Sequence, residues 1–241
     1  LRGGAGDDTM EGGADADTFI IEDGFGNDAI VGGETTTDPG DSDFDTIDLS
    51  ALSGPVTVTY TGDEAGTITN GTDTSTFSEI ERIILTDQAD VVDATADNSG
   101  AHIDGGAGND TIEGGFSNDL LIGGTGDDTI YAMVDDDING SNADNRLLGG
   151  EGDDNLYGSN GSDILEGGAD NDDLKGGGGA DEIDGGSGED VASYFFSSAG
   201  VTVTLGGAVG SGGEAQGDTI INVENLKGSG HDDVLTGDDL A

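Results

Sequence analysis

The chain has 241 residues with 53 Asp or Glu, 5 Lys or Arg and no Cys, so its formal net charge is −48 at pH 7. The basic residues are scattered, which excludes a surface for nucleic acid or anionic lipid. No apolar run approaches the ~20 residues of a membrane span, and without Cys there are no disulfides or thiolate metal sites. Such a polyanion either stays disordered or has its charge neutralised by something outside the sequence.

The first 34 residues contain a nine-residue repeat. Residues 3–11 read GGAGDDTME, residues 12–20 read GGADADTFI, and DGFGNDAIV follows at 23–31 after two extra residues. The shared pattern is G-G-x-G-x-D-x-U-x, where U is apolar. Glycines allow a tight turn over the first six residues, and the last three suffice for a short strand with U pointing inward. We predict stacked coils of two repeats, with turn n above turn n+2.

Residues 35–104 have a different texture. Segments 56–60, 67–69 and 80–85 alternate between apolar and polar residues, as antiparallel strands do. Residues 96–104 return to the nine-residue phase with Ile103 at U but Ala101 at the sixth position, which predicts a metal-free rung. We predict that 35–104 is a strand-rich connector or cap that runs into roll turns.

The main repeat block spans 105–193, and its phase is disturbed only at 132–148, which has 17 residues. Reading back from Gly149, 140–148 is a full unit with Asn145 at the sixth position. The unit before it has lost one turn residue and keeps Asp136 in phase. Asp135, Asp137, Asn139 and Gly140 also match the opening of an EF-hand loop, although Arg146 stands at its twelfth position. A degenerate roll turn and an independent calcium loop both remain open.

Residues 194–227 match the first connector at an offset of 143 to 145 residues: SGPVTVTY (53–60) aligns with AGVTVTL (199–205), and FSEIERI (77–83) with IINVENL (220–226). Asp90 and Asp233 take the sixth position in the turns that follow the two copies. We predict a second connector or cap at 194–227 and the start of a further roll block at 228–241. A ligand-binding β-element is the alternative for both copies.

The nonapeptides resemble those of the RTX family, the repeats-in-toxin or hemolysin-type calcium-binding proteins. The resemblance covers 3–33, 105–193 and 228–241. It implies an all-β fold, a calcium-loaded parallel β-roll, in a protein exported by type I secretion from a Gram-negative bacterium. The chain begins Leu1-Arg2-Gly3, so we expect a fragment of a larger secreted protein.

Paired turns bring two Asp carboxylates and several carbonyl oxygens together, which is the all-oxygen environment that Ca²⁺ prefers. Position by position, Asp110 pairs with Asp128, Asp154 with Asp172, Asp163 with Asp181, and Asp172 with Asp190, while Asp8 with Asp28 is weakened by the two-residue insertion. We expect roughly 4–9 Ca²⁺. The candidate ligands are Asp8, Asp17, Asp28, Asp110, Asp119, Asp128, Asp136, Asp154, Asp163, Asp172, Asp181, Asp190 and Asp233.

No catalytic constellation is recognisable. The two histidines, His102 and His231, both fall in predicted turns, and no phosphate-binding loop occurs. We therefore predict a non-catalytic structural module in which calcium drives folding after export. The alternatives are an accessory calcium module of a secreted protease, lipase or alginate epimerase, and an adhesin or matrix protein whose connectors bind glycans or a cell surface.

Overall fold

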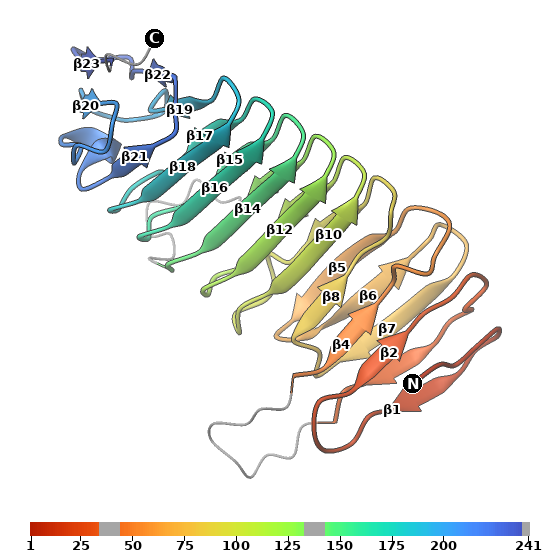
Figure 1. The fold of residues 1–241 in the computed structure, drawn as a ribbon. Helices are drawn as coiled ribbons and strands as arrows, with labels where there is room; N and C mark the ends of the chain where they lie inside the picture. The colour runs from red at the N-terminus through yellow and green to blue at the C-terminus, as the bar shows by residue number, and fades with distance from the viewer. Residues whose placement is uncertain (34–43, 133–142, 238–241) are drawn as a thin grey trace.

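The computed structural model describes residues 1–33, 44–132 and 143–237, which form a long roll of parallel strands with the N-terminus at one end and the C-terminus at the other (Figure 1). Two large sheets face each other within these ranges, and the chain alternates between them. Sheet A, in spatial order, contains β1 (Thr9–Glu11), β3 (Ala29–Val31), β7 (Thr74–Ser78), β6 (Ala65–Thr69), β5 (Thr57–Gly62), β9 (Val91–Asp93), β11 (Thr111–Glu113), β13 (Thr129–Tyr131), β15 (Asn155–Tyr157), β17 (Asp173–Lys175), β19 (Val191–Ser193) and β22 (Asn225–Lys227).

Sheet B contains β2 (Thr18–Ile20), β4 (Thr46–Asp48), β8 (Arg82–Ile84), β10 (His102–Ala107), β12 (Leu120–Thr125), β14 (Arg146–Glu151), β16 (Ile164–Ala169), β18 (Glu182–Ser187) and β21 (Thr219–Ile221). A small third sheet pairs β20 (Thr202–Thr204) with β23 (Val234–Thr236), and a short 3₁₀ helix, η1, covers Gly213–Ala215. The predicted all-β parallel β-roll is confirmed. No helix among the described residues is long and apolar enough to cross a membrane.

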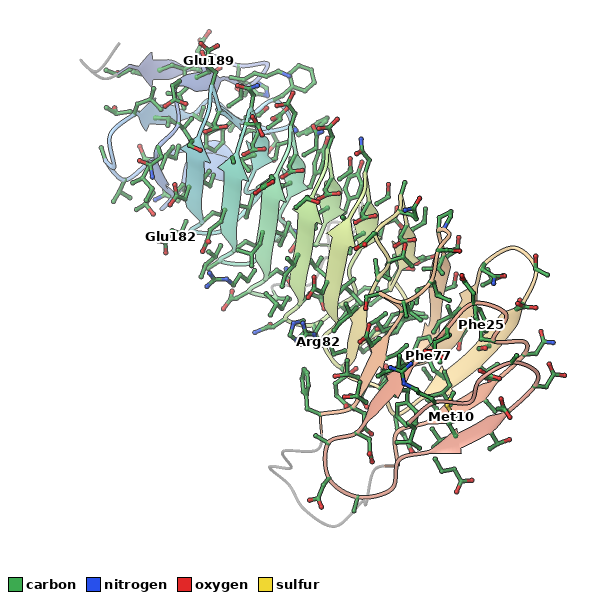
Figure 2. The ribbon with its side chains drawn as sticks, turned by 45° about the vertical axis from the view of Figure 1, so that its right-hand side comes forward. Met10, Phe25, Phe77, Arg82, Glu182 and Glu189 are labelled. Atoms are coloured by element: carbon green, nitrogen blue, oxygen red, sulfur yellow. The ribbon has the colours of Figure 1, made fainter. Side chains whose placement is uncertain are left out.

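The core consists of the U residues, as the repeat predicts. The three-residue strands β11, β13 and β15 each bury their middle side chain and turn its neighbours outward, because side chains alternate across a strand. Equivalent U residues stack in register, for example Ile112 on Ile130 and then Leu156. Figure 2 shows Phe77 within the N-terminal half of the roll, whereas the side chains of Glu182 and Glu189 point into solvent. The interior is therefore a narrow apolar stack between two acidic edges.

The antiparallel strands of the first connector lie within sheet A. Strand β6 pairs antiparallel with both β5 and β7. Strands β7 and β5 in turn pair parallel with the roll strands β3 and β9, so the three antiparallel-linked strands lie between β3 and β9. The expectation of an antiparallel strand at 80–85 is wrong. Strand β8 is a parallel roll strand between β4 and β10, because Ile83 is the U residue of its coil.

The second connector repeats the pairing of the first. Strands β3 with β7, β4 with β8 and β5 with β9 correspond to β18 with β21, β19 with β22 and β20 with β23. Individual hydrogen bonds are also shared: Val56 N–H donates to Asp90 Oδ1 (2.7 Å), and Val201 N–H donates to Asp233 Oδ1 (2.9 Å). Strand β6 has no counterpart, since residues 206–217 with η1 take its place. The internal duplication therefore extends to the topology.

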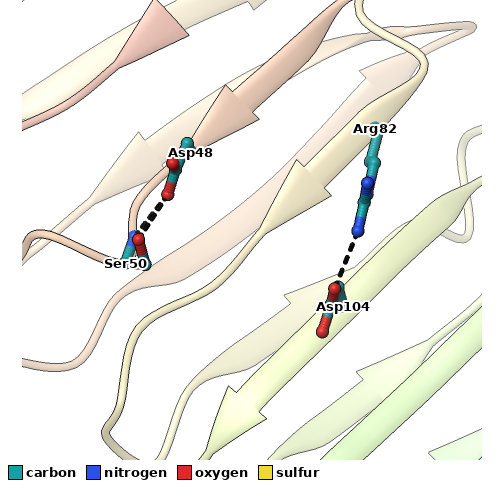
Figure 3. Close-up of polar contacts among 4 residues, drawn as sticks. All are labelled: Asp48, Ser50, Arg82 and Asp104. Carbon is teal, nitrogen blue, oxygen red and sulfur yellow. Dashed lines mark hydrogen bonds and ion pairs between the residues drawn. The ribbon is translucent and has the colours of Figure 1, made fainter. Parts of the chain in front are cut away.

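The outer faces carry ion pairs and local polar contacts (Figure 3). Arg82 Nη2 on β8 lies 2.8 Å from Asp104 Oδ2 on β10, and Ser50 donates to Asp48 Oδ1 from its N–H (3.0 Å) and its hydroxyl (2.6 Å). The prediction that His102 lies in a turn is wrong. The residue belongs to β10 and faces outward, because its neighbour Ile103 takes the inward position of the strand.

Candidate metal sites

The turns of the roll fall into two series. We call a turn an A turn when its sixth residue directly precedes a strand of sheet A, and a B turn when it precedes a strand of sheet B. The two series lie on opposite edges of the roll, since each links the end of one sheet to the start of the other. The sixth-position residues of the main block divide accordingly, with Asp110, Asp128, Asp154, Asp172 and Asp190 in A turns and Asp119, Asn145, Asp163 and Asp181 in B turns.

Along the A edge the carboxylates form a ladder. The backbone N–H of each sixth residue donates to Oδ1 of the equivalent Asp one coil later: Asp110 to Asp128 (2.7 Å), Asp128 to Asp154 (2.6 Å), Asp154 to Asp172 (2.9 Å) and Asp172 to Asp190 (2.9 Å). One carboxylate is thereby fixed above the next at the spacing of neighbouring strands, roughly 4.8 Å.

The B edge has the same ladder with different residues. Ala101 N–H donates to Asp119 Oδ1 (2.7 Å), Asp119 N–H to Asn145 Oδ1 (2.9 Å), Asn145 N–H to Asp163 Oδ1 (2.7 Å) and Asp163 N–H to Asp181 Oδ1 (2.9 Å). Asp181 N–H then donates to Asp218 Oδ1 (3.0 Å). Carboxylates on this edge are thus interrupted by Ala101 and Asn145.

The structure brings each of the four pairs predicted in the main block into neighbouring turns. Asp8 and Asp28 are also neighbours, because Asp8 N–H donates to Asp28 Oδ1 (2.9 Å) despite the insertion between them. Asp17 N–H donates to Oδ1 of Asp45 (2.7 Å). Nine of the candidates are buried, namely Asp28, Asp110, Asp119, Asp128, Asp154, Asp163, Asp172, Asp181 and Asp190, while Asp8, Asp17 and Asp233 are partly exposed. Asp136 lies outside the described residues, as does the EF-hand-like segment 135–140.

The interpretation of 132–148 as two rungs is wrong. The ladder runs from Asp128 directly to Asp154 and from Asp119 directly to Asn145, with 26 residues per coil where neighbouring coils have 18. The eight additional residues therefore all fall in the B turn between β13 and β14. This places Asp110 and Asp154 on the same edge, whereas two rungs within 132–148 in place of one would put them on opposite edges.

Two sixth-position Asp residues were not predicted, Asp45 and Asp218, which are both buried. Each precedes a roll strand, β4 or β21, although the turn before it does not have the length of the nonapeptide. The last four positions of the repeat, D-x-U-x, are still present as Asp45-Thr46-Ile47-Asp48 and Asp218-Thr219-Ile220-Ile221. That shorter pattern is the signal that could have found them.

The second carboxylate oxygen of the A-turn residues is where a cation fits. Oδ2 of Asp110, Asp128, Asp154, Asp172 and Asp190 is buried and has no hydrogen-bond partner within the described residues. These five side chains are at most 2 % exposed. A buried carboxylate oxygen without a donor is strongly destabilising unless a cation or a proton binds it.

The opening glycine of each turn makes room for that oxygen. A Cβ atom on Gly123, Gly149 or Gly167 would overlap Oδ2 of the Asp that closes the same turn, respectively Asp128, Asp154 or Asp172. Within the described residues no three His, Cys, Asp or Glu side chains gather at one point. A site in these turns therefore combines carboxylates with backbone carbonyl oxygens, which suits a hard cation such as Ca²⁺.

The pKa values of the A-turn carboxyl groups without metal also favour the binding of a cation in these turns. Burial, followed by repulsion from neighbouring carboxylates, raises the pKa of Asp110, Asp154 and Asp172 to about 7, far above the usual 3.8. Burial likewise raises the pKa of Asp128 to about 6. At neutral pH these carboxyl groups are therefore poised to bind positive charge.

The comparisons agree with the geometry. The RTX calcium-binding nonapeptide repeat matches the chain in four copies, at residues 1–20, 104–138, 134–165 and 157–192. No curated protein matches the chain. The matched ranges contain the whole A-turn ladder from Asp110 to Asp190. Residues 1–20 and 104–192 are therefore RTX calcium-binding nonapeptide repeats.

Proposed function

We propose that calcium binding in the turns drives the folding of this chain after export, and that the chain acts as a non-catalytic structural module of a secreted protein. The observation that carries the proposal is the row of buried, donorless Oδ2 atoms from Asp110 to Asp190. Because the roll cannot close these turns at neutral pH without a cation, the free energy of binding becomes free energy of folding.

The apolar core alone buries too little surface to offset the repulsion of a chain with net charge −48. Each repeat buries one U side chain, such as Leu156 or Leu174, whereas nine residues lose backbone entropy when the repeat folds. In a calcium-poor cytosol the chain would therefore stay extended and competent for type I secretion, and it would fold at the roughly millimolar calcium outside the cell.

A structural role is also supported by the positions of the histidines. His102 packs its ring 5.6 Å from that of Phe44 on the outer face, and His231 lies in the exposed turn before β23. Several coils separate the two residues, since His102 is on β10, midway along sheet B, and His231 is at the C-terminal end.

Far-ultraviolet circular dichroism and size-exclusion chromatography of the calcium-depleted chain test the proposal. We expect an expanded, unordered chain that gains β-signal and contracts on addition of millimolar Ca²⁺, with Mg²⁺ as the control ion of equal charge. A β-signal of full size in the calcium-depleted chain at pH 7.5 would overturn the proposal, as would an equal response to Mg²⁺.

A further inference from the structure

We propose that the calcium ions of the main block lie only along the A edge, in four sites between its five consecutive Asp turns, and that the B turns close without metal. This inference deepens the proposed function and rests on it. It differs from the expectation of paired sites on both edges, including a site between Asp163 and Asp181.

The two edges differ first in their backbones. The sheet B strands continue three residues into each A turn, so Gly106, Gly124, Gly150, Gly168 and Gly186 pair in register from coil to coil. The sheet A strands β11, β13, β15 and β17 stop after three residues and do not extend into the B turns. The opening residues of an A turn are thus held by the neighbouring coils, whereas those of a B turn can bend back onto their own Asp.

Hydrogen bonds from the opening residues of the B turns to their own Asp follow from this difference. In the B turns, Gly115 N–H donates to Asp119 Oδ2 and Ser159 N–H donates to Asp163 Oδ2, each at 2.9 Å. At the C-terminal end of the same edge, the Tyr194 hydroxyl donates to Asp218 Oδ2 (2.8 Å). Both oxygens of these carboxylates are therefore satisfied by protein donors. The five A-turn carboxylates keep a buried Oδ2 without such a donor among the described residues.

Asp181 is the exception among the B turns of the main block, since its buried Oδ2 has no hydrogen-bond partner among the described residues. Its neighbours along the edge are Asp163 and Asp218, whose oxygens are already engaged. A site between two turns takes carboxylate oxygens from both, as the A edge offers. Asp181 stands alone and does not form one.

The sequence of the B turns points the same way. Ala101 and Asn145 replace two of their carboxylates, whereas every A turn from 105 to 190 ends in Asp. In the main block the turn that is enlarged, between β13 and β14, also leads into a sheet B strand. The A turns from 105 to 190 all keep six residues, the length that a repeated cage between stacked turns requires.

Hydrogen bonds within the protein also mark the two ends of the A-edge ladder of five carboxylates. Before Asp110, Asp90 Oδ2 accepts from the N–H (2.8 Å) and the hydroxyl (2.9 Å) of Thr86. After Asp190, the sixth position is occupied by Glu224, whose Oε2 accepts from Asp190 N–H (3.0 Å). The ladder is therefore bounded by the two connectors and leaves four gaps between its five carboxylates.

Calcium counting on the full chain by equilibrium dialysis tests the partition. The matched variants are Asp154→Asn and Asp163→Asn, because both residues are 1 % exposed and accept a backbone N–H from the preceding coil. We expect Asp154→Asn, which borders two gaps, to lose one or two bound ions and Asp163→Asn to lose none. Equal losses in both variants would overturn the partition, whereas a wild-type chain that binds no calcium would overturn the proposed function instead.

If Asp154→Asn does not fold at any calcium concentration, a second set of variants tests whether the B turns bind calcium. The triple variant Asp119→Asn, Asp163→Asn and Asp181→Asn removes the remaining carboxylates of the B turns in the main block, and Asn already stands at position 145. We expect this variant to fold and to bind the wild-type number of ions. Loss of even one ion, including loss in Asp181→Asn alone, would place a site on the B edge.

Discussion

The N–H of Asp128 donates a 2.6 Å hydrogen bond to Oδ1 of Asp154, although 26 residues separate them where the coils on either side have 18. The roll therefore keeps its register across an eight-residue enlargement of one turn. Closing a longer loop costs little, since the entropy grows only with the logarithm of its length. Stacking on the neighbouring coils fixes the position of each rung.

Deleting residues 133–140 should restore an 18-residue coil and leave the roll intact. We expect the free energy of unfolding in saturating calcium to change by less than about 1 kcal/mol, and the number of bound ions to stay the same. The deletion removes Asp135, Asp136 and Asp137, so it tests this segment as a source of ligands. Fewer ions by equilibrium dialysis would show that the segment binds calcium.

Gly150→Ala should weaken the stacking of the coils. Gly150 has a φ of +125°, and a Cβ there would overlap the carbonyl oxygen of Gly124 in the coil below. The left-handed backbone alone costs an alanine roughly 1–2 kcal/mol, so we expect at least this loss in urea unfolding at fixed calcium. Gly54→Ala is the control, because a Cβ there meets no atom within 4 Å. Equal stability of the two variants would contradict the packing described here.

Tyr194→Phe should destabilise the C-terminal part of the roll. The variant leaves Asp218 Oδ2 buried without its hydroxyl donor, which costs about 1–3 kcal/mol. Tyr157→Phe removes a hydroxyl on the outer face of sheet A, where we expect a change within about 0.5 kcal/mol. Both are measured by urea unfolding in saturating calcium. An unchanged midpoint in Tyr194→Phe would show that water or a rearranged turn replaces the phenol.

Acid should partly substitute for calcium. The pKa of Asp110, Asp154 and Asp172 in the metal-free roll is about 7, against 3.8 for an unperturbed Asp, so the folded state binds protons more tightly than the unfolded state. The resulting stability is fully present below about pH 4 and is lost as pH rises through 7. We expect the calcium-depleted chain to gain β-signal between pH 8 and pH 5 by circular dichroism.

Potassium chloride at pH 8 is the control for this acid effect, because salt screens the general repulsion of a chain with net charge −48 without protonating buried carboxylates. An equal β-signal in salt would assign the acid effect to net charge. Removal of calcium by ion exchange is preferable to a chelator, whose affinity falls in acid.

The nine-residue phase allowed much of this structure to be predicted. Glycine and Asp at fixed positions determine the turn, and one apolar residue per unit, such as Ile112 or Leu165, determines the inward face. The carboxylate pairs follow from the stacking of turn n on turn n+2. This information lies in the repeat unit and in the regular spacing at which the unit recurs, so it can be read from the sequence.

The distribution of protein donors was not predictable in the same way. Whether Oδ2 of an Asp accepts a hydrogen bond depends on a nearby backbone N–H such as that of Ser159, or on a distant side chain such as Tyr194, which lies 24 residues before Asp218. The nonapeptide gives Asp154 and Asp163 the same sixth position, and only the pairing of the turn backbones distinguishes them. The edge assignment of Asp154 similarly depended on how many rungs the irregular stretch 132–148 contributes.

The exchange of sheets between the two connectors has a consequence for the shape of the rod. Strands β3 and β7 of the first copy belong to sheet A, whereas their counterparts β18 and β21 belong to sheet B; β4 and β8 are exchanged for β19 and β22 in the opposite sense. An odd number of half-coils therefore separates the copies, and the second is related to the first by a half-turn about the rod axis together with a translation. The pair β3 with β7 and its counterpart β18 with β21 therefore lie on opposite faces of the roll, so a flat surface that covers one pair cannot cover the other.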